Sequence, residues 1–329
     1  MSKKRIVVVC PGRGSYTKDT LGYLKKNPNI KSFLSDLDER RRALGDPDIT
    51  GLDSASSFKT SVHTKGEHAS PLIYACSYSD FQSIDREQND IVAICGNSMG
   101  WYLTLSFAES LDWEGSFNVI QTMGGMMRSN LIGAQFIYPI CDDDWNINPE
   151  RIKHVEKHLN DDVHISIRLG GYLVLAGEMD ACKFMMKKLD KVGDYPFQLI
   201  NHGAFHTPLL QSISDAGFEQ LPQNLFHAPK IPMIDGRGHV WQPYSTDVEA
   251  LRDYTLRHQV LETYDFTKSI EVALKEFIPD QLVLLGPGNS LGGVIGQCLV
   301  ETRWKGIQHK EAFQELQKGS DPILVSMGL

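Results

Sequence analysis

Three apolar segments are each cut short by a glycine-rich loop, and this pattern constrains the fold more than any other feature of the 329-residue chain. Residues 6–10 (IVVVC) precede PGRGS, residues 91–95 (IVAIC) precede GNSMG, and residues 281–285 (QLVLL) precede GPG. Such continuous apolar runs are typical of strands buried in a parallel sheet that helices cover on both faces. Ligand sites in these sheets lie at the carboxyl ends of the strands, so we expect all three loops at one site.

The middle of the chain, residues 134–200, follows a different pattern. Its apolar runs are short, charged helical stretches separate them, and Gly170-Gly171 marks a tight turn. The expected order is a strand at 134–140, a helix at 149–159, strands at 163–167 and 172–176, and a helix at 180–189. We therefore predict an α/β fold with two parts: a hydrolase-like catalytic part with a parallel sheet (residues 1–133 and 201–329) and a small ferredoxin-like α+β insert (residues 134–200).

Composition and charge exclude several classes of protein. With 41% hydrophobic and 22% charged residues the chain is an ordinary globular protein, and its net charge of −8 argues against a nucleic-acid partner. The six cysteines form no CxxC pair, and no apolar stretch has the length of a signal peptide or a membrane span. We therefore expect a cytoplasmic protein with no membrane partner and, because no heptad pattern occurs, a monomer.

The strongest chemical signal is GNSMG at 96–100, a G-x-S-x-G placed between an apolar run and a helical pattern at 101–111. Glycines allow the sharp turn that exposes the Ser98 hydroxyl, and the helix that follows directs N–H groups towards developing negative charge. A glycine-serine turn without chemistry is the plainer interpretation. The strand–turn–helix context favours a nucleophile.

A serine nucleophile needs a base, and the chain has 11 histidines. His206 is the best placed, because it follows an apolar run that ends near residue 200 and precedes a helix that starts with proline. His202 is its rival, with a surface or core-edge position as the alternative. His154 and His158 have the spacing of metal ligands, but no glutamate accompanies them as in a metalloprotease helix, so we expect a solvated face and no metal site.

Five separated motifs together resemble the malonyl-CoA:acyl-carrier-protein transacylase family, which includes polyketide-synthase acyltransferase domains. They follow the family's order over nearly the whole chain: CPGRGSY at 10–16, GNSMG at 96–100, AFHTPL at 204–209, HQV at 258–260 with TKSI at 267–270, and GPGNSL at 286–291. The resemblance implies Ser98 as nucleophile and His206 as base, oriented by a main-chain carbonyl near Gln259. It also implies an oxyanion hole formed by the backbone N–H groups of Met99 and Arg13.

The resemblance further implies a ping-pong reaction without a bound cofactor. Acyl-CoA is the expected substrate that loads Ser98, and the phosphopantetheine thiol of an acyl carrier protein is the expected acceptor, in fatty-acid or polyketide-type biosynthesis. Two alternatives stay open. One is an acyl hydrolase that removes acyl groups from carrier proteins, and the other is a non-catalytic scaffold that binds carrier proteins.

The chain departs from the family pattern around the acyl group, which marks an atypical member. Met123 stands where malonyl-specific members have the arginine that pairs with the substrate carboxylate. Arg13 replaces a glutamine and is either a substitute cation or a solvated loop arginine, while Ser70 and Asn97 replace a glutamine and a histidine. Phe205 resembles members with small acyl pockets. We therefore predict a short acyl group in a pocket that these five residues line.

Overall fold

The computed structural model describes residues 2–329. The strands are β1 (Lys4–Cys10), β2 (Asn89–Gly96), β3 (Ala134–Pro139), β4 (Val163–Leu169), β5 (Tyr172–Gly177), β6 (Phe197–Leu199), β7 (Met233–Ile234), β8 (Val240–Trp241), β9 (Tyr264–Asp265), β10 (Gln281–Leu284) and β11 (Leu324–Ser326).

The α-helices are α1 (Lys31–Ala43), α2 (Ile49–Asp53), α3 (Thr60–His63), α4 (Gly66–Ser83), α5 (Gly100–Phe107), α6 (Trp113–Gly125), α7 (Pro149–Glu156), α8 (Met179–Lys188), α9 (Gln211–Gln220), α10 (Val248–Asp253), α11 (Gln259–Leu261), α12 (Phe266–Phe277), α13 (Gly292–Glu301) and α14 (Lys310–Gln317). A π-helical turn, η6 (Tyr254–His258), joins α10 to α11. Short 3₁₀ helices are η1 (Lys18–Thr20), η2 (Tyr23–Lys26), η3 (Pro28–Ile30), η4 (Pro208–Leu210), η5 (Gln223–Leu225) and η7 (Trp304–Gly306).

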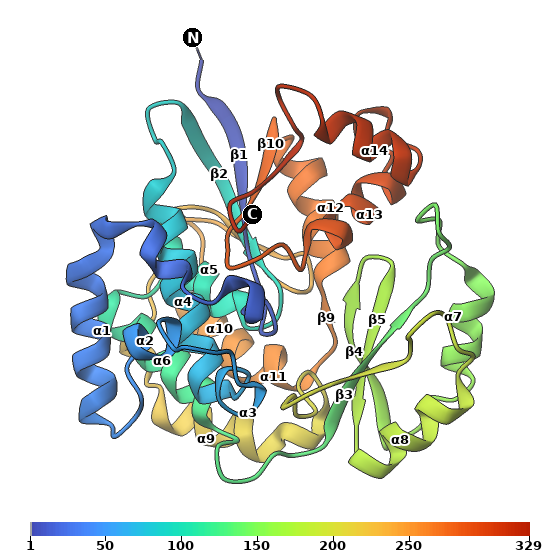
Figure 1. The fold of residues 1–329 in the computed structure, drawn as a ribbon, viewed down its shortest axis with the longest axis horizontal. Coiled ribbons are helices and arrows are strands. Elements are labelled where there is room, and N and C mark those ends of the chain that lie inside the picture. The colour runs from blue at the N-terminus through green and yellow to red at the C-terminus, as the bar shows by residue number, and fades with distance from the viewer. Residues whose placement is uncertain (1) are drawn as a thin grey trace.

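The first sheet has the strand order β11-β10-β1-β2-β7-β8, and all neighbours are parallel except the last pair. In Figure 1 the helices of the first half of the chain, in blue and cyan, lie on one side of β1, β2 and β10. Helices α12, α13 and α14, in orange and red, lie on the other side. Coverage on both sides explains why the central strands consist of apolar side chains with no polar face.

The register of β1 against β2 brings two glycine loops together. Val9 pairs with Cys95 and Cys10 with Gly96, so both strands end at the same level. The amide of Asn97 donates to the Cys10 carbonyl oxygen at 3.1 Å, which extends the pairing beyond the strand end. The loop after β1 therefore lies directly beside the serine turn after β2.

The second sheet has the order β6-β3-β5-β4-β9. Its first four strands pair antiparallel in the order of a ferredoxin-like fold, while β9 adds to β4 in parallel. Helices α7 and α8 lie on one side of this sheet (Figure 1), where Phe136, Leu175 and Met185 belong to a separate apolar core. The predicted fold class is confirmed, and the limits of the two parts, 134 and 200, stay a prediction.

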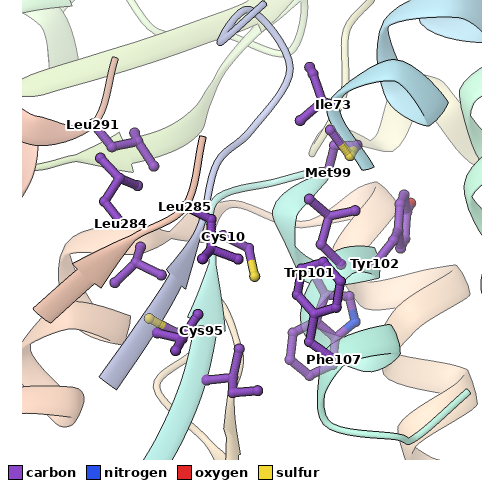
Figure 2. Close-up of a cluster of buried hydrophobic side chains, with 14 of the residues drawn as sticks. Cys10, Ile73, Cys95, Met99, Trp101, Tyr102, Phe107, Leu284, Leu285 and Leu291 are labelled. Atoms are coloured by element: carbon purple, nitrogen blue, oxygen red, sulfur yellow. The ribbon is translucent and has the colours of Figure 1, made fainter. Parts of the chain in front are cut away.

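The main core lies between the first sheet and its helices. Figure 2 shows part of it, where Cys10 and Cys95 of adjacent strands lie between Leu284 of β10 and Trp101 of α5. Trp101 is fully buried, and its indole nitrogen donates to the hydroxyl of Thr255 at 3.0 Å. Burial of such a large side chain with its polar atom satisfied stabilises the position of α5 against the sheet.

The helix that follows the serine turn is shorter than the sequence pattern indicates. The pattern predicts a helix over 101–111, whereas α5 ends at Phe107. Glu109 has a φ of 56°, in the left-handed region, and this conformation is incompatible with continuation of the helix. The correction shortens the helix without changing its start at the serine turn.

The described residues carry no disulfide. All six cysteines are free, and five are buried. Within residues 2–329, no helix combines the length and the apolar character that crossing a membrane requires. The same part of the chain holds no group of three histidine, cysteine or acidic side chains placed to bind a metal ion.

Candidate active site

Ser98 occupies a sharp turn between β2 and α5. Its φ is 54°, a left-handed conformation that costs a non-glycine residue about 1–3 kcal/mol. The flanking glycines make the turn possible, because a Cβ on Gly96 would lie 2.3 Å from the Gly100 carbonyl oxygen. A Cβ on Gly100 would lie 2.5 Å from the Cys10 carbonyl oxygen. The G-x-S-x-G spacing is therefore a steric requirement of this turn.

The turn brings Ser98 to His206, which lies 108 residues further along the chain. The Ser98 Oγ is 2.8 Å from His206 Nε2. The other ring nitrogen, Nδ1, donates to the main-chain carbonyl oxygen of Gln259. Because a carbonyl oxygen can only accept, Nδ1 carries the hydrogen and Nε2 presents a lone pair to the serine hydroxyl. This is the tautomer that a general base needs.

The surroundings of His206 keep its ring neutral. The side chain is 1% exposed, and burial lowers its pKa to about 4, although the bond to the Gln259 carbonyl acts in the opposite direction. Within residues 2–329 no carboxylate bonds to the ring, so the pair is a dyad without an acidic third member. At neutral pH His206 can therefore accept a proton from Ser98.

Gln259 connects the two halves of this pair. Its side-chain nitrogen donates to the Ser98 carbonyl oxygen at 3.1 Å, and its side-chain oxygen accepts from the Tyr102 hydroxyl at 3.1 Å. Its main-chain oxygen lies in the three-residue helix α11, where the last carbonyls have no partner within the helix. That oxygen is consequently available to His206, and the neighbouring Val260 oxygen accepts from the His206 amide at 2.9 Å.

Two backbone amides beside Ser98 have no acceptor of their own. Met99 lies at the start of α5, and Arg13 lies in the loop after β1. Neither N–H donates a hydrogen bond to any atom of residues 2–329, and both residues line the cavity that Ser98 faces. An oxygen that acquires negative charge at this point would find two free donors.

Ser98 opens onto a cavity of about 230 Å³ between the two sheets. The second sheet contributes a mostly aliphatic wall to this cavity, through Ile137, Ile167, Val174 and Leu199. Among the described residues that line the cavity, Arg13 is the one permanently charged side chain. The site therefore suits a short, largely apolar group attached near Ser98.

All five residues predicted for the acyl pocket line this cavity: Arg13, Ser70, Asn97, Met123 and Phe205. Met123 is 2% exposed and contributes no charge.

The guanidinium of Arg13 is half-buried, donates to the Asn201 carbonyl oxygen at 2.7 Å and lies 5.6 Å from the centre of the Phe205 ring. Burial lowers the Arg13 pKa to about 10, so the side chain stays charged at neutral pH. It is a packed cation at the edge of the cavity. Arg128, the next arginine after Met123, pairs with Asp46 at 2.8 Å and does not line the cavity.

Other polar residues line the cavity although the sequence analysis did not predict them for the acyl pocket. His202, weighed as a rival base, forms no hydrogen bond with Ser98 within residues 2–329; its Nδ1 lies 3.0 Å from Oε1 of Gln135. Gln135 and Tyr102 also line the cavity. The signal for Gln135 was available, because a polar residue in an otherwise apolar strand, AQFIYP, is expensive to bury unless it has partners.

The parallel sheet with a ferredoxin-like sheet beside it, and the Ser98–His206 pair between them, can be compared with proteins of known structure. The sequence matches no protein-family model and no curated protein. Among solved structures, the malonyl-CoA:ACP transacylase of Synechocystis sp. PCC 6803 has a TM-score of 0.77 at 15% identity, over 99% of this chain and 97% of that one.

Two further structures connect the fold to polyketide systems. The acyltransferase domain from the second module of the salinomycin polyketide synthase has a TM-score of 0.72 at 17% identity, over 99% of this chain and 69% of that one. A malonyl-transacylase in complex with its type II polyketide acyl-carrier protein has a TM-score of 0.73 at 19% identity, over 90% and 93%. The resemblance inferred from the motifs is confirmed at the level of the fold.

Proposed function

We propose that this protein is a serine acyltransferase that moves a short acyl group from acyl-CoA to the phosphopantetheine thiol of an acyl carrier protein. The observation that carries the proposal is the 2.8 Å contact between Ser98 Oγ and Nε2 of a buried, neutral His206, at the end of an apolar cavity. The transacylase structure that contains its own carrier protein supports the choice of acceptor.

In the first half-reaction Ser98 Oγ attacks the thioester carbonyl carbon while its proton passes to His206 Nε2. The amides of Met99 and Arg13 donate to the oxygen that becomes negative. The carbon–sulfur bond then breaks, and the CoA sulfur leaves with the proton from His206. The product is an ester on Ser98 and free CoA.

In the second half-reaction the carrier-protein thiol gives its proton to His206 and attacks the ester carbon. Ser98 Oγ leaves and takes the proton back, which restores the enzyme and forms the carrier thioester. Water in place of the thiol would give a free acid, which is the reaction of an acyl hydrolase. Because Met123 supplies no cation for a carboxylate and the Arg13 guanidinium is already bonded to the Asn201 carbonyl oxygen, we expect the best acyl group to be uncharged.

The test is to incubate the purified protein separately with acetyl-, propionyl-, butyryl-, malonyl- and methylmalonyl-CoA and to follow its intact mass. An adduct of acyl mass, mapped to Ser98 by peptide analysis and discharged by a holo carrier protein, supports the transferase. Steady release of free acid without transfer to the carrier supports hydrolysis instead. Absence of both an adduct and any turnover contradicts the proposal.

A further inference from the structure

A chain of hydrogen bonds fixes the orientation of the Gln135 side chain at the edge of the cavity. Ser166 Oγ donates to the Phe205 carbonyl oxygen at 2.9 Å, so its own hydrogen is used. It therefore accepts from Gln135, whose amide nitrogen lies 2.8 Å away. The same nitrogen lies 3.4 Å from the Phe205 carbonyl oxygen. The opposite orientation of the amide would place two carbonyl oxygens face to face without a hydrogen between them.

This orientation determines where His202 carries its hydrogen. The Gln135 oxygen faces His202 Nδ1 at 3.0 Å, and an amide oxygen can only accept, so Nδ1 must donate. The neutral ring then has a lone pair on Nε2. Burial, followed by the nearby charge of Arg13, lowers the pKa of His202 well below its ordinary value, so this neutral form persists at physiological pH.

The Nε2 atom of His202 is an acceptor without a partner. It bonds to no atom of residues 2–329, and it is not among the polar side-chain atoms of that part of the chain that are both unpaired and inaccessible to solvent. His202 and Gln135 both line the cavity that holds Ser98, and Gln135 lies among its aliphatic side chains, as the register partner of Leu199 on the adjacent strand. An occupant of the cavity that donates a hydrogen bond would satisfy this lone pair. An aliphatic occupant would displace the water that bonds to Nε2 and would leave the lone pair without a hydrogen bond.

We propose that His202 makes the cavity selective for short acyl groups that carry a hydroxyl group, whose O–H donates to His202 Nε2. The inference rests on the acyl transfer proposed above and specifies its substrate class. A carboxylate offers only acceptor oxygens to the same lone pair. The cavity of about 230 Å³ holds roughly eight water molecules at ~30 Å³ each, which is room for a four-carbon hydroxyacyl group.

The test compares the rates at which thioesters of one chain length acylate Ser98. The probes are 2-hydroxybutyryl-CoA, both enantiomers of 3-hydroxybutyryl-CoA, butyryl-CoA and malonyl-CoA, and the readout is the intact mass over time. We expect at least one hydroxyacyl thioester to acylate Ser98 roughly 10-fold faster than butyryl-CoA in kcat/KM. Acylation by butyryl-CoA at a rate equal to or above that of every hydroxyacyl thioester overturns the proposed selectivity. The proposed acyltransferase activity would still be supported by that result.

Two kinds of variant distinguish the effect of the hydrogen-bond acceptor on the acylation rates from the effect of cavity size. His202→Phe removes the lone pair, and Gln135→Leu removes the anchor that fixes the tautomer, so both should bring the hydroxybutyryl-to-butyryl rate ratio towards one. Leu169→Ala enlarges the same cavity from β4, a strand that does not pair with the strand of Gln135; it should change both rates and keep their ratio. A hydroxybutyryl-to-butyryl rate ratio that is unchanged in both His202→Phe and Gln135→Leu overturns the inference. No adduct from any thioester with the wild-type protein overturns the acyltransferase and the inference together.

Discussion

The side-chain nitrogen of Gln259 donates to the carbonyl oxygen of Ser98 at 3.1 Å, and this bond links the Ser98 turn to the element that orients the His206 ring. The main-chain oxygen of Gln259 accepts from the His206 ring. One residue therefore sets the position of both members of the dyad, through two different parts of its structure. Its side chain is a positioning group that can be removed while the main-chain contact stays.

Gln259→Leu tests this arrangement. The variant loses the bonds to the Ser98 carbonyl and the Tyr102 hydroxyl but keeps the main-chain oxygen. We expect Ser98 acylation to slow by roughly 10- to 100-fold, because the turn shifts relative to His206. The free energy of unfolding, measured with urea, should fall by about 1–3 kcal/mol. Tyr102→Phe, which removes only one of the two bonds, should have a smaller effect. A Gln259→Leu protein that is acylated at the wild-type rate would contradict the positioning role.

Ser98→Ala should abolish the acyl adduct and reduce turnover by roughly 10⁴- to 10⁶-fold, because the covalent route is removed. Ser212→Ala, at an exposed position on α9, provides a matched serine replacement that should behave like the wild type. Both proteins can be followed by intact mass and by CoA release. Unchanged turnover in the Ser98 variant would exclude the covalent mechanism.

The acid limb of the pH profile should lie unusually low. His206 works as a base only when it is neutral, and burial lowers its pKa to about 4. Below that value the ring is protonated and acylation stops; above it the rate should stay level from about pH 5.5 to about pH 8. With a histidine of ordinary pKa as the base, the acylation rate would fall to half near about pH 6.5. The measurement is kcat/KM for acylation against pH, with circular dichroism to establish that the protein stays folded. A limb near pH 6.5 would show that burial does not control this base.

Met123→Arg should widen the substrate range towards carboxylated acyl groups. The new guanidinium would line the cavity and could pair with a carboxylate, so the malonyl-to-butyryl acylation ratio should rise roughly 10-fold or more. The buried charge should lower stability by about 1–3 kcal/mol. Met123→Gln keeps a similar length without charge and should leave the ratio unchanged. Equal ratios in the two variants would mean that this position does not face the acyl group.

A buried arginine away from the active site should dominate the stability of the helices around it. Arg41 is fully buried and donates to the side chain of Gln121 at 2.6 Å and to the Glu67 carbonyl at 2.9 Å, with Asp46 at 3.9 Å. Arg41→Ala removes the donor to the Gln121 and Glu67 oxygens and should lower the free energy of unfolding by about 3–5 kcal/mol, measured with urea. Arg128→Ala removes the half-exposed partner of the same Asp46 and should cost about 1 kcal/mol. Equal losses of unfolding free energy in the two variants would contradict the expectation that the buried Arg41 stabilises the protein more than Arg128 does.

The sequence predicted those parts of the molecule that depend on local pattern. Continuous apolar runs indicated β1, β2 and β10, and the spacing of Gly96 and Gly100 around Ser98 indicated the turn, because sterics at that turn leave few other residues. His206 was inferred from its position after a strand, and the structure brings it to Ser98.

Contacts between segments that are far apart in the sequence could not be predicted in the same way. The apolar wall of the cavity depends on how the second sheet lies against the first, and no periodicity encodes that placement. The bond between Gln135 and His202 joins residues 67 positions apart. His202 was consequently weighed as a base, although the structure places it in the lining of the cavity with its Nδ1 bonded to Gln135.

The nucleophile and the aliphatic wall belong to different sheets, and this separation has a consequence for how such a protein can diversify. Substitutions of the aliphatic cavity residues in β3, β4, β5 or β6 should alter the shape of the cavity, because within residues 2–329 no side chain of these strands bonds to Ser98, His206 or Gln259. Under the proposed acyl transfer, substrate preference can therefore be altered one strand at a time without a change to the Ser98–His206 pair. A library confined to the cavity-facing positions of the second sheet should yield mostly active enzymes with new preferences.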